Sequence, residues 1–252
     1  MKIFITGISS GIGRELCIKL ISLGHTVWGV ARRLDLLESL QSELKSDKFM
    51  YTVCDVSNTE EIVRTAAAMD AANFLPEVIV LNAAIERKDL QNGFRVGISE
   101  EVFSVNFFGA LKWVELFIGK FSERGSGKFI AISSIFAQRP DIDSVAYCSS
   151  KAALSMAFRS LNLRHYQKKI NFFNIYLGPV DTDISSKNNH PAMPPKKSFL
   201  IVSPQSAANF IIKSIRGKRS SRYFPFFTTF PIRLTFFLSD PAFFRATRMW
   251  RR

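Results

Sequence analysis

Two hydrophobic periods alternate along the first 186 residues of the chain. Short, nearly continuous apolar runs such as KIFITG and KFIAISS predict buried strands. Between them lie segments such as RELCIKLISLG, in which leucines recur at helical spacing and a glycine marks the helix end. We expect strands at 2–7, 25–32, 49–56, 77–83, 128–134 and 170–179, and helices at 14–24, 34–45, 60–69, 102–117, 146–166 and 203–217.

Strands that alternate with helices predict an α/β protein with a Rossmann-type, doubly wound parallel sheet and helices on both faces. Strands of this kind are apolar throughout because helices cover both sides. The 252 residues suffice for one large core. We therefore predict a single catalytic domain at 1–220, followed by a basic, aromatic C-terminal extension at 221–252. Ligands of such sheets bind at the carboxyl ends of the strands.

Charge separates the last quarter of the chain from the rest. Of the net charge of +13, Lys187 to the end carries 13 Lys and Arg against the single acid Asp240. Residues 221–252 also hold eight phenylalanines, and no uncharged apolar stretch there is long enough to span a bilayer. This composition fits contact with an anionic membrane surface. It fits equally well packing on the core, lining of the pocket or a subunit interface. No motif predicts nucleic-acid binding.

Cysteine and histidine usage indicates a reducing compartment without a metal site. Cys17, Cys54 and Cys148 are scattered and form no CxxC pair, and the three histidines lack ligand spacing. The N-terminal apolar run is too short for a signal peptide. We expect a cytoplasmic protein, peripheral on the membrane surface if the extension binds lipid, and no metal.

The segment TGISSGIG follows the first predicted strand and opens the first predicted helix. Glycines at 7, 11 and 13 allow a tight turn and a close approach of the backbone to a phosphate. The helix N-terminus adds free N–H groups and the positive end of a dipole. The sequence therefore predicts a nucleotide-binding loop, spaced GxxxGxG rather than GxGxxG.

The segment YCSSK places Tyr147 and Lys151 four residues apart on a predicted helix, so they share a face. A nearby ammonium lowers the pKa of a phenol and makes it a better acid–base group near neutral pH. Ser134 ends the strand KFIAISS upstream of this pair.

Taken in order, these motifs resemble the short-chain dehydrogenase/reductase family. Besides the glycine loop, the chain matches its NAG motif as Asn82-Ala83-Ala84, and its PGxxxT motif as Gly178-Pro179-Val180-Asp181-Thr182 with the first two residues exchanged. The resemblance implies catalytic roles for Asn106, Ser134, Tyr147 and Lys151. In these roles Ser134 binds the substrate oxygen, Tyr147 moves the proton, Lys151 tunes Tyr147 and grips the nicotinamide ribose, and Asn106 holds a relay water.

For the cofactor we predict NADP(H). The second strand ends in Ala31 followed by Arg32 and Arg33, where an acid would favour NAD, and arginine forks bind a 2′-phosphate well. The resemblance extends the expected cofactor site to Thr6, Gly7, Ser9, Ser10, Gly11, Ile12, Gly13, Arg14, Arg32, Arg33, Asp55, Val56, Asn82, Ala83, Ala84, Tyr147, Lys151, Pro179, Val180 and Thr182.

The predicted activity is NADPH-dependent reduction of a carbonyl to an alcohol, or the reverse, on a hydrophobic or lipid-like ketone or aldehyde. A polar, proline-bearing segment at 183–200 is expected to form a lid over the substrate. The resemblance also implies a homo-oligomer. One alternative is a non-enzymatic NADP(H)-binding regulator, although such proteins commonly lose the Tyr or Lys that this chain keeps. A sugar-nucleotide epimerase or dehydratase is disfavoured by the glycine spacing.

Overall fold

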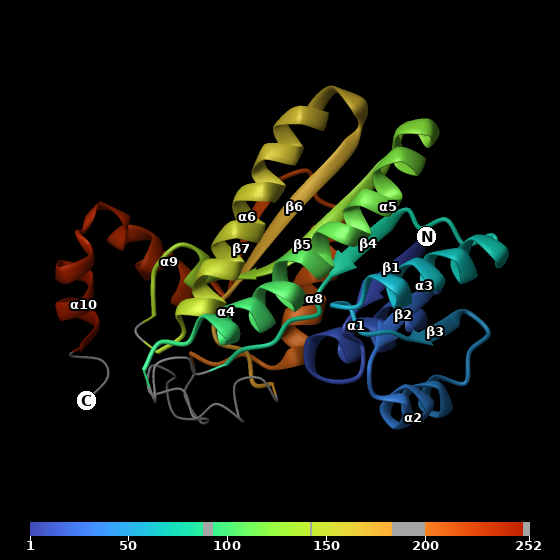
Figure 1. The fold of residues 1–252 in the computed structure, drawn as a ribbon, viewed down its shortest axis with the longest axis horizontal. Coiled ribbons are helices and arrows are strands. Elements are labelled where there is room, and N and C mark those ends of the chain that lie inside the picture. The colour runs from blue at the N-terminus through green and yellow to red at the C-terminus, as the bar shows by residue number, and fades with distance from the viewer. Residues whose placement is uncertain (88–92, 142, 183–199, 249–252) are drawn as a thin grey trace.

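The computed structural model describes residues 1–87, 93–141, 143–182 and 200–248. All six predicted strands form, and a further strand joins them in one parallel, seven-stranded sheet of order β3-β2-β1-β4-β5-β6-β7 (Figure 1). The strand bounds are β1 Lys2–Thr6, β2 Thr26–Ala31, β3 Phe49–Val53, β4 Val78–Leu81, β5 Gly127–Ser134, β6 Ile170–Leu177 and β7 Ser221–Phe224.

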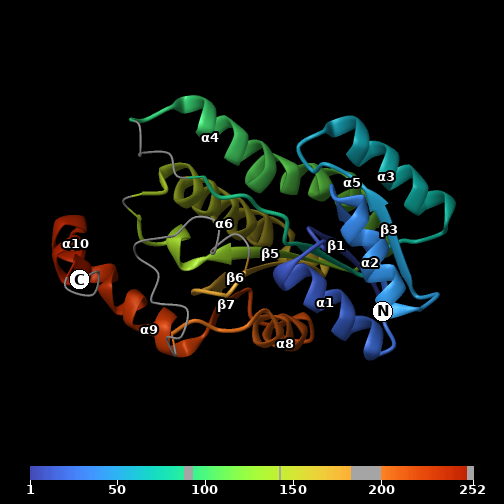
Figure 2. The same ribbon diagram turned by 90° about the horizontal axis from the view of Figure 1, so that it is seen from below.

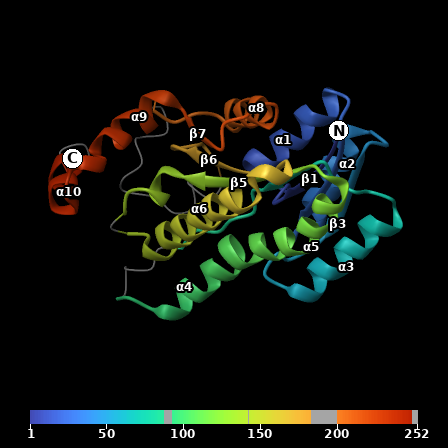
Figure 3. The same cartoon turned by 90° about the horizontal axis from the view of Figure 1, so that it is seen from above.

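Helices cover both faces of this sheet, as predicted. Helices α1, α2 and α8 supply side chains to one core, and α3, α5 and α6 supply side chains to the other (Figures 2 and 3). The helix bounds are α1 Gly11–Ser22, α2 Leu34–Leu44, α3 Thr59–Ala71, α4 Val96–Phe103, α5 Gly109–Arg124, α6 Val145–His165, α8 Pro204–Ile215, α9 Phe226–Leu234 and α10 Asp240–Arg248.

The two cores explain why the central strands are largely apolar on both faces. On β1, Ile3 and Ile5 belong to one core, while Phe4 between them belongs to the other and packs on Trp113 of α5. Successive side chains of a strand point to opposite faces. A strand buried on both sides must therefore be apolar throughout, and the alternation of a half-exposed sheet disappears.

The predicted helix at 102–117 is part of a longer one, the continuous stretch Val96–Arg124, which includes a π-helical segment at Ser104–Phe108. This stretch is long and apolar enough to cross a membrane by length and composition. Its side chains Trp113, Phe117 and Phe121 are fully buried in the core, which accounts for its apolar character.

The predicted helix at 203–217 forms as α8. The Ser203 hydroxyl caps it by accepting the Ser206 N–H at 3.2 Å, and Pro204 occupies the first turn. The predicted lid lies outside the described residues except for Leu200.

The C-terminal extension begins later than the sequence suggests. Residues 221–224 form β7, which pairs with β6 at the edge of the catalytic sheet. The boundary predicted at 221 therefore moves beyond Phe224. The chain then continues into α9 and α10, which lie together at one end of the molecule, away from β3 and α2 (Figure 1).

Candidate active site

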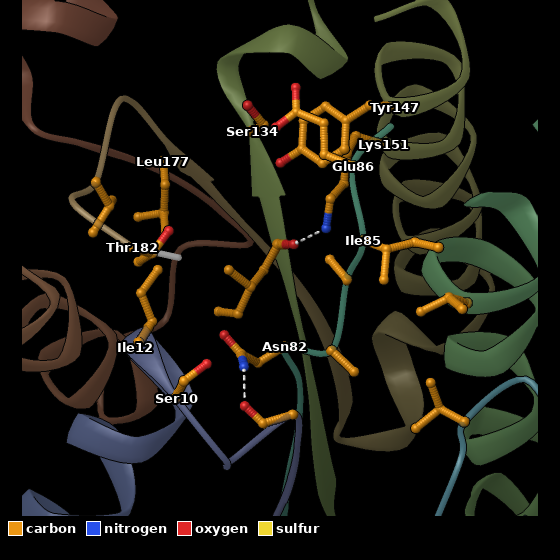
Figure 4. Close-up of a pocket in the computed structure, with 18 of the residues that line it drawn as sticks. Ser10, Ile12, Asn82, Ile85, Glu86, Ser134, Tyr147, Lys151, Leu177 and Thr182 are labelled. Atoms are coloured by element: carbon orange, nitrogen blue, oxygen red, sulfur yellow. Dashed lines mark hydrogen bonds between the residues drawn. The ribbon is translucent and has the colours of Figure 1, made fainter. Parts of the chain in front are cut away.

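A cavity of about 380 Å³ opens at the carboxyl ends of the strands (Figure 4). Its walls come from the loops that follow β1 to β6, together with the first part of α6. These segments are distant in sequence, but parallel strands bring their carboxyl ends to one edge. The predicted site residues that line it are Gly7, Ser9, Ser10, Gly11, Ile12, Arg32, Arg33, Asp55, Val56, Asn82, Ala83, Ala84, Ser134, Tyr147, Lys151, Pro179, Val180 and Thr182.

Asn82 fastens the glycine loop to β4. Its amide nitrogen Nδ2 donates to the carbonyl oxygens of Thr6 and Gly7 at 3.1 and 3.0 Å. In return, the Thr6 hydroxyl accepts the backbone N–H groups of Asn82 and Ala83, both at 3.0 Å. Thr6 therefore holds the loop from beneath and does not itself line the cavity.

Close backbone contacts account for the glycines of this loop. Gly7 has φ of +76°, and a Cβ there would lie 2.8 Å from Ala83 Cα. A Cβ on Gly13 would lie 2.1 Å from the Gly7 carbonyl oxygen and 2.7 Å from Asn82 Nδ2. Gly13 thus allows α1 to approach the loop, which is a packing role behind the cavity wall.

The two arginines that follow β2 differ in their contacts. The Arg33 guanidinium lies over the glycine loop, where Nη2 donates to Ser9 Oγ at 2.8 Å and to Ser10 Oγ at 2.9 Å. Arg32 pairs with Asp55 at 3.4 Å. Burial raises the Asp55 pKa, but hydrogen bonds from Ser57 and the Arg32 charge outweigh it and leave that pKa below its ordinary value.

Arg14 does not lie beside Arg32 and Arg33 at the cavity. Its guanidinium pairs with Glu43 of α2, and Arg14 does not line the cavity. The expectation that it adds a second cation for the cofactor phosphate is therefore not met in this structure. Arg14 lies on α1 beyond the loop, where its guanidinium is close enough to pair with Glu43 of α2.

Ser134, Tyr147 and Lys151 converge at the other end of the cavity (Figure 4). The Ser134 hydroxyl hydrogen-bonds the Tyr147 phenol and accepts the Phe136 N–H at 3.2 Å. Lys151 Nζ lies 5.6 Å from the centre of the Tyr147 ring and donates to the Ile132 carbonyl at 2.9 Å. The neighbouring Ser133 pairs instead with Ser155 of α6 at 2.7 Å, which supports Ser134 as the reacting serine.

Burial governs how the pair titrates. It raises the Tyr147 pKa above its ordinary value, the Glu86 charge raises it further, and the hydrogen bond from Ser134 opposes both. Burial lowers the Lys151 pKa to about 8, against the opposing effect of Glu86. Burial and the Glu86 charge dominate at Tyr147, so the predicted lowering of the Tyr147 pKa by Lys151 stays a prediction.

Asn106 lies in the π-helical segment and is almost fully buried. Its side chain accepts the Ile85 N–H at 2.8 Å, donates to the Ile85 carbonyl at 2.9 Å and donates to Ser150 Oγ at 3.1 Å. These bonds hold the loop after β4 against α6. They give the Asn106 amide a structural role, which is the alternative to holding a relay water. Its part in proton relay remains a prediction.

Glu86 is a cavity residue that the sequence reasoning missed. It is buried at 8% exposure, accepts a hydrogen bond from Ser144 Oγ at 3.0 Å, and its charge acts on both Tyr147 and Lys151. The available signal was its position: an acid four residues after Asn82, in a loop that leaves the carboxyl end of a buried strand.

The chain is similar in sequence and fold to known proteins. A family model described as short chain dehydrogenase matches residues 1–192. A mouse protein, dehydrogenase/reductase SDR family member 7, is 28% identical over 73% of this chain, and the match spans 56% of its length. A fatty acyl-CoA reductase of Acinetobacter baylyi is 29% identical over 85% of this chain and 73% of its own.

A solved structure with the same fold is a short chain dehydrogenase from Burkholderia cenocepacia in complex with NADP. It superposes with a TM-score of 0.81 at 19% identity, over 98% of this chain and 96% of its own. The likeness confirms the doubly wound fold.

Gly13→Ala is expected to destabilise the fold by about 1–3 kcal/mol, because the added Cβ meets backbone atoms that cannot move aside. The matched control is Gly119→Ala in α5, where a Cβ meets nothing within 4 Å. That control should be neutral or stabilising by up to about 1 kcal/mol, since alanine favours a helix. Urea unfolding of both variants measures the difference; equal effects would contradict the packing role of Gly13.

Proposed function

Because this chain belongs to the short-chain dehydrogenase/reductase family of oxidoreductases, we propose that it reduces a carbonyl to an alcohol with NADPH, or catalyses the reverse. One observation carries the proposal: Ser134, Tyr147 and Lys151 meet in the cavity whose opposite end is formed by the glycine loop and Arg33. Because the chain retains both Tyr147 and Lys151, a non-enzymatic regulator is disfavoured.

The cofactor is NADP(H). The backbone N–H groups at the start of α1 suit a pyrophosphate, and Arg33 with the hydroxyls of Ser9 and Ser10 suits a 2′-phosphate. Arg32 and Asp55 would meet the adenosine, and Lys151 would hold the nicotinamide ribose, as the family resemblance implies. Support also comes from the NADP complex of the Burkholderia protein. The cofactor, when bound, accepts or donates a hydride at the substrate carbon.

The protein's own groups handle the proton. In the reduction, the Ser134 hydroxyl donates a hydrogen bond to the carbonyl oxygen, and Tyr147 gives its phenolic proton to that oxygen as it becomes an alkoxide. The ammonium of Lys151 stabilises the phenolate that remains. With a pKa of about 8, Lys151 is mostly charged at neutral pH and supplies this field. The reverse reaction runs the same transfers backwards.

The substrate we propose is apolar, a long-chain or lipid-like ketone or aldehyde. Beside the reacting groups the cavity is walled by Ile135, Phe136 and Leu177. Support from a relative is the fatty acyl-CoA reductase, whose name concerns a fatty chain. The phenylalanine-rich C-terminal segment lies next to this wall, since a Cβ on Gly178 would meet Thr228 Oγ1 of α9 at 2.4 Å.

The remaining parts of the proposal concern context. We place the enzyme in the cytoplasm as a homo-oligomer, with membrane-surface contact through the C-terminal segment. We propose the oligomer because members of the family are commonly dimers or tetramers. The membrane contact follows from the composition of residues 221–252 and from the exposed aromatic side chains of α9.

Tyr147→Phe should lower kcat by about 10²–10⁴-fold, because the reaction loses its general acid. NADPH affinity should change little, since the ring and Lys151 remain. The substrate is the best one in a panel of long-chain ketones and aldehydes, and cofactor binding is followed by NADPH fluorescence. Tyr166→Phe, at an exposed position near the end of α6, is the control. A Tyr147→Phe enzyme with the parent kcat would contradict the assignment.

Arg33→Ala should weaken NADPH binding by about 10–100-fold while leaving NADH binding nearly unchanged, since only a 2′-phosphate uses the guanidinium fork. Isothermal titration of both cofactors gives the two Kd values directly. Arg32→Ala, which breaks the pair with Asp55, is the matched variant and should discriminate less between the cofactors. A parent protein that binds NADH more tightly than NADPH would overturn the cofactor assignment.

Glu86→Gln should move the alkaline limb of the pH profile of carbonyl reduction to lower pH. The reduction needs the Lys151 ammonium beside Tyr147 and is lost as pH rises through the Lys151 pKa of about 8, which the Glu86 charge raises. Removing that charge lowers this pKa. The profile of kcat/KM is compared with that of Glu123→Gln, an exposed position on α5. An unmoved limb, or one displaced to higher pH, would show that the Glu86 charge does not act on Lys151.

A further inference from the structure

The C-terminal segment exposes a row of large apolar side chains. Phe237 is 94% exposed and Phe227 is 76% exposed, among the highest values for large apolar side chains in the described structure. Single exposed apolar residues are ordinary, but several from one short segment mark a contact surface. We call the following set the aromatic face: Phe226, Phe227, Phe230, Leu234, Phe236 and Phe237.

The aromatic face is ordered by helix geometry. Phe226, Phe230 and Leu234 follow one another at intervals of four residues along α9, which aligns them on one side of the helix. The rings of Phe226 and Phe230 stack at 4.8 Å. Thr229, from another side of α9, is 1% exposed. The helix therefore packs one side on the protein and presents the aromatic side outward.

The segment is fastened to the catalytic domain beside the cavity. Arg139, in the loop that leaves β5 after Ser134, pairs with Asp240 of α10 at 3.0 Å and donates to the Leu238 carbonyl at 2.9 Å and to the Thr235 carbonyl. At the start of the segment, the Gly178 N–H donates to the Phe224 carbonyl at 2.7 Å. Gly178 lines the cavity and a Cβ on it would meet Thr228 of α9, so α9 lies next to the cavity wall.

Charge accompanies the aromatic face. Arg233 and Arg245 are exposed on α9 and α10, and Asp240, the single acid after residue 186, is already paired with Arg139. The chain beyond residue 186 carries 13 Lys and Arg in all. A second copy of the chain docked on this face would bring like charges together. A surface of anionic lipid satisfies both the aromatic side chains and the cations.

We infer that the aromatic face inserts among the headgroups of an anionic phospholipid bilayer and holds the cavity against the membrane surface. The phenylalanines enter the boundary between headgroups and acyl chains, while Arg233 and Arg245 meet the lipid phosphates. This places the substrate side of the cavity where an apolar carbonyl compound dissolves. The docking develops the membrane contact of the proposed function, and this last consequence also rests on the proposed reaction.

Co-sedimentation of the full-length protein with vesicles tests the docking without substrate or cofactor. Vesicles of phosphatidylcholine with phosphatidylserine should bind it, and vesicles of phosphatidylcholine alone should bind it at least about tenfold less. Binding should fall as salt screens the charges. The double variant Phe227→Ser/Phe237→Ser should lose at least about tenfold in affinity, because two largely exposed rings no longer enter the lipid.

The matched control removes equally exposed apolar side chains elsewhere. Leu163 and Tyr166, 78% and 79% exposed, lie near the end of α6. Leu163→Ser/Tyr166→Ser should bind the anionic vesicles as the parent does. Equal loss in both double variants, or no binding by the parent, overturns the inference. So does a parent that ignores vesicles but self-associates through the face, seen as a smaller mass for Phe227→Ser/Phe237→Ser in analytical ultracentrifugation. Because no turnover is measured, failure here leaves the proposed reaction untouched.

Discussion

The junction between β1 and β4 is the contact on which the site depends. The sheet order runs outward in both directions from this pair, so the loops after the two strands diverge and leave a crevice. Asn82 closes the floor of the crevice by donating to the carbonyls of Thr6 and Gly7. Gly13 permits the approach of α1, which leaves the first N–H groups of that helix facing the opening. A backbone held in this way is preorganised for an anion before any anion binds.

The reacting end of the cavity is built on a conflict between burial and charge. Lys151 is 3% exposed, and its nitrogen donates to the Ile132 carbonyl, which compensates only part of the lost hydration. Glu86 favours the charged lysine but disfavours a charged tyrosine. The field at Tyr147 is therefore a balance of opposing charges in a poorly solvated place, where each of them acts more strongly than in water. Burying charged groups in this way lowers the stability of the fold, a cost that is common at functional sites.

Hydrophobic period was enough to predict six of the seven strands and the helices that cover them, because strand order and crossover handedness leave few arrangements. The predicted residues that line the cavity came from motifs at the ends of those strands and from the family resemblance. Hydrophobic period does not predict a strand or a side-chain contact that depends on residues far along the chain. Strand β7 is four residues with no apolar run, and only its pairing with β6 makes it a strand. Helix α9 contains Pro231, which argues against a helix locally. Neither Glu86 nor Arg139 belongs to a motif, and their contacts lie 58 and about 100 positions away.

The two halves of the cavity differ in how the sequence encodes them. The cofactor half is made of backbone and short side chains whose spacing along the chain is set by strand–loop–helix geometry, so a few glycines and one asparagine reveal it. The substrate half is walled by Ile135, Phe136 and Leu177, and the segment that begins after β7 lies beside this wall, where Arg139 and the Phe224 carbonyl hold it. The exposed side chains of that segment can change without disturbing the sheet. The sequence motifs therefore predict the class of reaction but not the substrate. The side chains of the cavity wall are the part of the structure that bears on the substrate.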